Sequence, residues 1–91
     1  MVEKIVTIKN HAGIHCRPSS VILEAVGKYK DVSFKVIAPN GESDLSSILG
    51  LLSLGLHCDD KATLQISGDK EEEIIEEIAS LFEYEFDFPQ D

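Results

Sequence analysis

His15 and Arg17, which stand two residues apart in the segment GIHCRP at 13–18, are the side chains with the clearest chemical potential in this sequence. A proline is tolerated in the first turn of a helix, where the backbone N–H groups have no intrahelical partner, so we expect a helix to begin at about residues 16–18. That end of a helix favours an anion, and a guanidinium can donate two parallel hydrogen bonds to phosphate oxygens. The segment therefore predicts a phosphate site at which His15 is the nucleophile and Cys16 and Arg17 bind the phosphate.

Length and composition indicate one small domain. The chain has 91 residues, 43% of them apolar, so we expect a single domain over 1–91. No apolar run approaches the ~18 residues that span a bilayer, and the N-terminus lacks the plan of a signal peptide, so we expect a cytoplasmic protein without membrane insertion. Two cysteines, Cys16 and Cys58, are too few for a disulfide framework.

The net charge of −9 narrows the choice of partners. Nucleic acids and anionic lipids both need a basic face, so the charge argues against either as the main partner. It favours a protein partner with a basic patch.

Apolar spacing alternates between strand and helix periods along the chain. It predicts a strand over 2–9, a helix from about 16 to 28–31, a hairpin of strands over 32–38 and 42–44, a short helix over 48–53, a strand over 61–67 and a helix after 69. Ser46 or Ser47 is expected to cap the short helix, and Asp69 with Glu72 resembles a capping box for the last one.

The order β-α-β-β-α-β-α predicts an α+β fold, an open-faced two-layer sandwich in which three helices cover one face of a four-stranded antiparallel sheet. Residues 83–91 alternate acidic and aromatic side chains and are expected to form an ordered flap at best. Ser19 and Ser20 are expected on the helix surface. Lys28 and Lys30 are expected to extend a weak cationic rim near Arg17.

Two segments carry a resemblance to a known family. The first is the Gly-Ile-His-x-Arg-Pro signature at 13–18, and the second is a serine followed by an apolar helix, SILGLLSLG, at 47–55. The chain resembles the HPr family, the histidine-containing phosphocarrier proteins of the bacterial phosphoenolpyruvate-dependent sugar phosphotransferase system. Length and element order match as well, so the resemblance covers nearly the whole chain and implies an HPr-like fold.

The resemblance implies a carrier of phosphate and not an enzyme that turns over alone. In the family, enzyme I passes phosphate from phosphoenolpyruvate to Nδ1 of the motif histidine, here His15, which hands it to the IIA domain of a sugar permease. Phosphoryl transfer needs positioning and charge stabilisation more than acid or base groups, so Arg17 and the helix end suffice and no cofactor is expected. A monomer is favoured, since the carrier must expose one small face to several proteins.

The second signature implies regulation by a kinase, HPr kinase/phosphorylase, at the serine that begins the short helix. The ungapped match places that serine at Ser47. His15 and Ser47 are one residue further apart than is usual in the family, so the neighbouring Ser46 stays an alternative. Phosphate there would lie beside an apolar surface that partners would cover. The residues expected in this partner interface are Ile48, Leu49, Leu51 and Leu52.

Two other classes of function compete with the phosphocarrier. One is a purely regulatory relative of HPr that acts through Ser47; such members usually lack the motif histidine, which this chain keeps. The other is a metal-binding module. Its candidate ligands are His11, His15, Cys16, His57 and Cys58. Their spacing matches no common zinc pattern, so no metal is expected.

Overall fold

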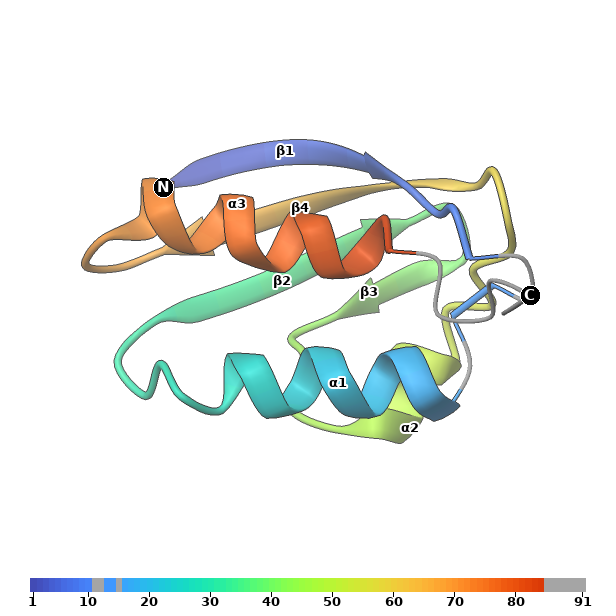
Figure 1. The fold of residues 1–91 in the computed structure, drawn as a ribbon, viewed down its shortest axis with the longest axis horizontal. Helices are drawn as coiled ribbons and strands as arrows, with labels where there is room; N and C mark the ends of the chain where they lie inside the picture. Colours follow the sequence, from blue (N-terminus) through green and yellow to red (C-terminus); the bar gives the residue numbers. More distant parts are fainter. Residues whose placement is uncertain (11–12, 15, 85–91) are drawn as a thin grey trace, which may run out of the picture.

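The computed structural model describes residues 1–10, 13–14 and 16–84, the side chain of Cys16 excepted. Within this part the chain forms seven helices and strands (Figure 1). They are β1 (Val2–Thr7), α1 (Cys16–Val26), β2 (Ser33–Ala38), β3 (Gly41–Ser43), α2 (Ile48–Leu52), β4 (Lys61–Ser67) and α3 (Glu71–Phe82). The order confirms the expected β-α-β-β-α-β-α arrangement.

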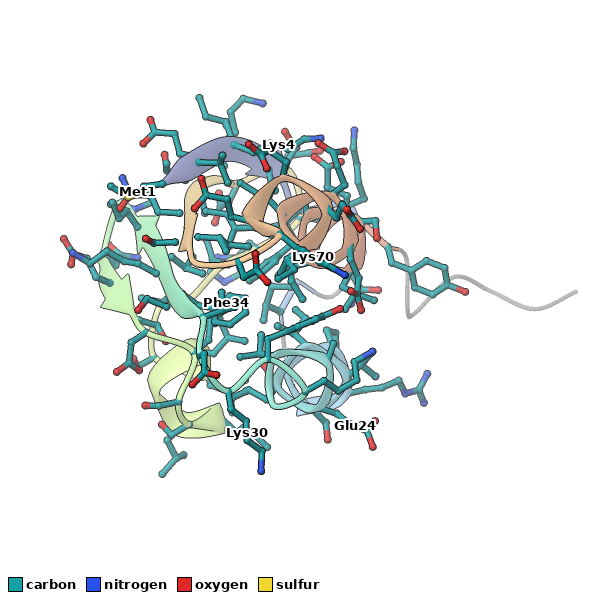
Figure 2. All side chains as sticks on the ribbon, turned by 90° about the vertical axis from the view of Figure 1, so that its left-hand side faces the viewer. Met1, Lys4, Glu24, Lys30, Phe34 and Lys70 are labelled. Carbon is teal, nitrogen blue, oxygen red and sulfur yellow. The ribbon has the colours of Figure 1, made fainter. Side chains whose placement is uncertain are left out.

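The four strands form one antiparallel sheet in the order β1-β4-β2-β3. The last strand in sequence, β4, therefore lies inside the sheet and pairs with β1 on one side and β2 on the other. Seen along the strands, the helices lie on one face of this sheet (Figure 2). Helix α3 packs on β1 and β4, and α1 packs against α3 and α2. The open-faced two-layer α+β sandwich is confirmed.

Strand alternation decides which side chains enter the core. Val6 and Ile8 are fully buried, whereas Ile5, which directly precedes Val6, is 64% exposed. Successive side chains of a strand point to opposite faces, so this alternation places one face on the helices and the other in solvent. The other strands contribute Phe34, Val36, Ala62, Leu64 and Ile66 to the core, and α3 contributes Ile74, Ile75, Ile78, Ala79 and Phe82.

The ends of two helices differ from the sequence expectation. Helix α1 ends at Val26 and not at 28–31, because Lys28 N–H bonds Ala25 C=O and Tyr29 N–H bonds Val26 C=O, which tightens the chain into turns. The expected Asp69 cap of α3 was wrong. Lys70 takes the N-cap position in the left-handed conformation, without a side-chain cap bond.

Glu71, the first residue of α3, ties the start of the helix to the segments around it. Its carboxylate accepts from Gly68 N–H at 3.1 Å and pairs with the Met1 amino group at 3.1 Å. These contacts hold the pKa of Glu71 below its ordinary value, the Gly68 bond first. The N-terminus is thereby attached to the helix that covers the sheet.

Ser19 was expected on the helix surface, and that expectation was wrong. Its side chain is fully buried in the first turns of α1, and its hydroxyl has no hydrogen-bond partner in the part of the chain that the structure describes. Pro18 beside it is also buried. This end of α1 therefore packs closely on the rest of the fold at Pro18 and Ser19.

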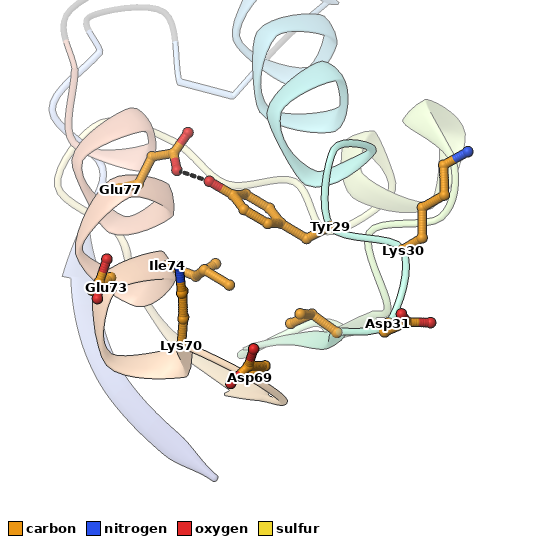
Figure 3. Close-up of a pocket in the computed structure, with 9 residues that line it drawn as sticks. Tyr29, Lys30, Asp31, Asp69, Lys70, Glu73, Ile74 and Glu77 are labelled. Atoms are coloured by element: carbon orange, nitrogen blue, oxygen red, sulfur yellow. Dashed lines mark hydrogen bonds between the residues drawn. The ribbon is translucent and has the colours of Figure 1, made fainter.

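Tyr29 and Glu77 link the chain after α1 to α3. The Tyr29 hydroxyl donates to a Glu77 carboxylate oxygen (Figure 3), and Lys28 Nζ lies 3.3 Å from the other oxygen. The hydroxyl donor lowers the pKa of Glu77, and the same bond raises the pKa of Tyr29. The Tyr29–Glu77 pair closes one side of a cleft of about 570 Å³. The connection from α1 to β2 and the connection from β4 to α3 line this cleft.

This pair predicts a pH-dependent stability. Because the folded state lowers the pKa of Glu77, the stabilisation is complete above the unfolded pKa of about 4.3 and is lost as the pH falls through the folded value. Tyr29→Phe should therefore have a lower urea midpoint than the parent protein at pH 7. The difference between the two midpoints should be smaller at about pH 3. Glu72→Gln, an exposed carboxylate of the same helix, is the control. Equal loss at both pH values would show that the ring packing, and not the hydrogen bond, had been changed.

Candidate functional site

The loop before α1 is held by backbone contacts on both sides of Gly13. Its N–H donates to Asn10 C=O at 2.9 Å, and Ile14 N–H donates to Leu56 C=O at 2.9 Å. Gly13 has φ +80°, and a Cβ built there would lie 2.5 Å from the Leu56 carbonyl oxygen. Only glycine fits such a position without moving the backbone. The backbone at Gly13 and Ile14 is thus held against Leu56.

Asn10 supports this loop, and the sequence analysis missed it. The side chain is fully buried, and its Nδ2 donates to Gly13 C=O at 2.8 Å. A buried amide that bonds the backbone three residues on is a typical local device of asparagine. The sequence signal for this role is an asparagine three residues before Gly13. An asparagine at such a position can equally be an exposed loop residue, so the sequence alone does not show that it is buried.

Helix α1 begins at Cys16, the residue directly after His15. Pro18 is buried, and the side chain of Arg17 is exposed. The early proline and the helix start match the sequence expectation. His15 and His11 lie outside the described residues, as does the side chain of Cys16, so the expected nucleophile and its Cys16 neighbour stay predictions.

The expected cationic rim near Arg17 was wrong. Arg17 lies in the first turn of α1, and Lys28 and Lys30 follow its other end (Figure 1). An 11-residue helix spans about 16 Å, which separates these charges by more than a Debye length. Lys28 instead pairs with Glu77.

The segment after α2 lies against this loop. Ile8 N–H donates to Asp60 C=O at 2.8 Å, and Asp59 N–H donates to Ile8 C=O at 2.7 Å. His57 is exposed, with Nδ1 3.6 Å from Asp60, and Cys58 is a free thiol. Across residues 1–10, 13–14 and 16–84, no three His, Cys, Asp or Glu side chains are grouped to hold a metal ion.

Ser47 is the N-cap of α2. Its Oγ accepts from Gly50 N–H at 2.9 Å, which satisfies one of the free donors of the first turn. Ser46 has a different contact: its N–H donates to Asp44 Oδ1 at 3.0 Å. The Ser46 hydroxyl and N–H together hold the pKa of Asp44 below its ordinary value. Of the two serines left open as caps, the structure selects Ser47.

The expected partner interface on α2 needs one correction. Ile48 is 40% exposed and Leu49 is 79% exposed, and Leu52 is half-buried. Leu51 is fully buried in the core, so it is not accessible to a partner. A five-residue helix that is apolar on every side does not reveal which side faces inward, and its packing against α1 decides this.

Removing the cap should weaken this helix. Ser47→Ala is expected to lower the free energy of unfolding by about 1 kcal/mol, because the Gly50 N–H loses its acceptor. Urea unfolding measures the change. Ser46→Ala is the matched control and should cost less than half as much. An equal effect of the two substitutions would contradict the assignment of the cap.

The cleft beside Tyr29 lies away from the loop at His15. It is lined by the connections between α1 and β2 and between β4 and α3, at the left of Figure 1, whereas α1 begins at the right. Figure 3 shows Asp31 and Asp69 on the side of the cleft opposite Tyr29. The cleft therefore contributes nothing to the candidate phosphate site.

Comparison with known proteins gives the family. Residues 2–84 match the family model of the PTS HPr component phosphorylation site. The phosphocarrier protein HPr of Mycoplasma pneumoniae is 37% identical over 79 residues, which are 86% of this chain and 89% of that protein. The HPr-like protein Crh of Halalkalibacterium halodurans is 30% identical over 86 residues, 93% of this chain and all of that protein.

The solved structures agree with the sequence relatives. The crystal structure of HPr-C-His from Thermoanaerobacter tengcongensis has a TM-score of 0.85 and 31% identity, covering 99% of this chain and 100% of that one. The fold and these relatives thus define a phosphocarrier component of the phosphotransferase system. The chain belongs to the HPr family. No helix among its described residues is long and apolar enough to cross a bilayer.

Proposed function

We propose that His15 accepts a phosphoryl group from phospho-enzyme I and passes it to the IIA domain of a sugar permease. The observation that carries the proposal is the start of α1 at Cys16, directly after His15, with the backbone of Gly13 and Ile14 held by hydrogen bonds before it and an exposed Arg17 after it. Free N–H groups and the dipole of this helix end favour a phosphoryl group. We place this exchange in the cytoplasm and the whole activity in one domain over 1–91.

The transfer needs little chemistry from this chain. The lone pair of Nδ1 in the neutral imidazole attacks phosphorus, and the bond from phosphorus to the donor atom of enzyme I breaks. The second transfer repeats the exchange with the IIA acceptor as nucleophile. Arg17 and the helix N–H groups neutralise the charge on the phosphoryl oxygens in both steps. The partners bring the remaining groups, so the chain acts as a carrier and not as an enzyme.

Intact-mass spectrometry tests the proposal. The protein is incubated with enzyme I and phosphoenolpyruvate, and His15→Ala is the matched variant. One phosphate lost in mild acid, present only in the parent protein, is the expected result. Absence of phosphate with an enzyme I that is active on another HPr would overturn the proposal.

We also propose that a serine kinase of the HPr kinase/phosphorylase type modifies Ser47. The exposed serine begins α2, next to the exposed side chains of Ile48 and Leu49. A phosphoserine adds about two negative charges there, which a helix N-terminus tolerates and an acidic partner does not. Kinase treatment should phosphorylate Ser46→Ala and leave Ser47→Ala unmodified. The reverse pattern would move the site to Ser46.

A purely regulatory role is the second candidate. The 30% identity to an HPr-like protein Crh over 93% of the chain favours it. The discriminating experiment adds a IIA domain from the same cell to the phosphorylated protein. Loss of phosphate from His15 to that domain supports the carrier, and a phosphate that stays on His15 supports the regulator.

A further inference from the structure

The connection from β3 to α2 (Figure 1) is anchored in the core by a leucine. Leu45 is 2% exposed and has φ +60°, a left-handed conformation that is rare for residues other than glycine. Its N–H donates to Oγ of Ser43 at 3.1 Å, and Ser43 is buried as well. Leu45 thus points inward, and its two neighbours in the chain, Asp44 and Ser46, are exposed.

Asp44 and Ser46 are joined by hydrogen bonds. Ser46 N–H donates to Asp44 Oδ1 at 3.0 Å, and the Ser46 hydroxyl also donates to this carboxylate. The contact of Ser47 is of the opposite kind, because its Oγ accepts from Gly50 N–H at 2.9 Å. One serine hydroxyl is therefore held as a donor by an anion, and the other is held as an acceptor by an N–H group.

A groove of about 320 Å³ lies beside Ser46. It is lined by Val26, Tyr29, Val32, Ser33, Phe34, Asp44, Leu45 and Ser46. Among these lining residues, all within the described part of the chain, Asp44 is the one charged side chain. A phosphate on Ser46 would meet this carboxylate, and the groove offers it no basic side chain.

Phosphorylation changes what a serine can do in such contacts. Serine Oγ forms a bond to the γ-phosphorus of a nucleoside triphosphate, the bond from this phosphorus to the β-phosphate oxygen breaks, and the hydroxyl proton passes to a base of the kinase. On Ser46, the donor that Asp44 binds would be replaced by oxygens that carry about two negative charges. On Ser47, these oxygens can still accept from Gly50 N–H.

We infer that Asp44 is a specificity-determining residue for the serine kinase, because its carboxylate disfavours a phosphoryl group on Ser46 and so directs modification to Ser47. This role of Asp44 rests on the proposed modification of Ser47. It gives a physical reason why one of two adjacent, exposed serines is chosen. The charges lie at the surface, so their repulsion weakens as the salt concentration rises.

Kinase rates on variants that keep one serine test this role. Ser46→Ala keeps Ser47, and Ser47→Asn keeps Ser46 while its amide oxygen can still cap α2. Intact mass should show Ser47→Asn modified at least about tenfold more slowly than Ser46→Ala. Adding Asp44→Asn to Ser47→Asn should raise its rate about tenfold, because asparagine keeps an acceptor for Ser46 N–H and removes the charge. Glu42→Gln removes an exposed carboxylate of β3 and is the matched control, which should leave the rate of Ser47→Asn unchanged.

A stability measurement tests the repulsion without a kinase. Ser46→Asp places a carboxylate beside Asp44, so it should have a lower urea midpoint than Ser46→Asn at pH 7. This difference should shrink when both variants also carry Asp44→Asn. It should shrink as well at about 1 M NaCl, where the Debye length falls to about 3 Å.

The outcomes separate this role of Asp44 from the kinase proposal. If neither the parent protein nor Ser46→Ala is modified while the midpoints behave as expected, the modification of Ser47 is overturned and the repulsion by Asp44 is supported. If Ser46→Ala is modified and Asp44→Asn leaves Ser47→Asn as slow as before, the role of Asp44 is overturned. A midpoint difference that Asp44→Asn leaves unchanged would overturn it as well.

Discussion

Gly13→Ala is expected to lose both stability and phosphate acceptance. The residue has φ +80°, and its new Cβ would lie 2.5 Å from the Leu56 carbonyl oxygen, a backbone atom that cannot rotate away. The left-handed conformation alone costs about 1–2 kcal/mol for alanine. Relieving the clash also breaks the bond from Ile14 N–H to Leu56 C=O. The free energy of unfolding should fall by at least about 2 kcal/mol.

The same substitution should also slow the phosphorylation of Gly13→Ala molecules that remain folded. The loop that leads to His15 shifts, and a displacement of about 1 Å from a productive geometry can cost about 100-fold in rate. Rates are measured by intact mass under conditions where urea curves show the variant folded. Gly27→Ala is the control, because that glycine has an ordinary φ and its new Cβ meets carbonyl oxygens at 3.4 and 3.6 Å. A folded Gly13→Ala that accepts phosphate at the parent rate would contradict the role given to this loop.

Arg17→Ala is expected to slow phosphoryl transfer by about 100- to 1,000-fold with little effect on stability. In acyl-transfer sites, the reaction slows by this factor when one preorganised hydrogen-bond donor to the charge of the transition state is removed. The side chain is exposed, so the free energy of unfolding should change by less than about 0.5 kcal/mol. Single-turnover transfer from phospho-enzyme I measures the rate.

Two further variants separate charge from geometry at Arg17. Arg17→Lys keeps the positive charge and loses the planar pair of donors, so its rate should lie between those of the parent and Arg17→Ala. Lys30→Ala removes an exposed cation beyond the far end of α1 and should transfer at the parent rate. If Lys30→Ala were as slow as Arg17→Ala, the effect would be one of net charge on partner docking.

The sequence predicts the elements of this fold because their signals are local. The alternation of Ile5, Val6 and Ile8 assigns the two faces of β1, and the early Pro18 locates the start of α1. The hairpin of β2 and β3 is confirmed, although β3 runs over Gly41–Ser43 and not over 42–44. Each of these features depends on residues within a few positions of one another.

Two of the errors concern polar residues in unusual environments. Ser19 is buried with no hydrogen-bond partner among the described residues, and Lys70 adopts the left-handed conformation at the start of α3. Composition favours a surface position for a serine and a capping role for Asp69. Packing of α1 and the bond from Gly68 N–H to Glu71 outweighed these preferences.

The same distinction between local sequence signals and tertiary contacts applies to the candidate site. The sequence by itself determined the motif around His15 and the family, because each motif is contiguous in the chain, but it left Ser46 and Ser47 as alternatives for the cap of α2, and the structure selects Ser47. Only the tertiary structure decided that Asn10 supports Gly13, that Leu51 enters the core beside exposed Leu49, and that Ile5 and Ile37 share a row across β4. Such relations join residues far apart in the chain or depend on which side of an apolar helix finds a neighbour, and no local pattern encodes that choice.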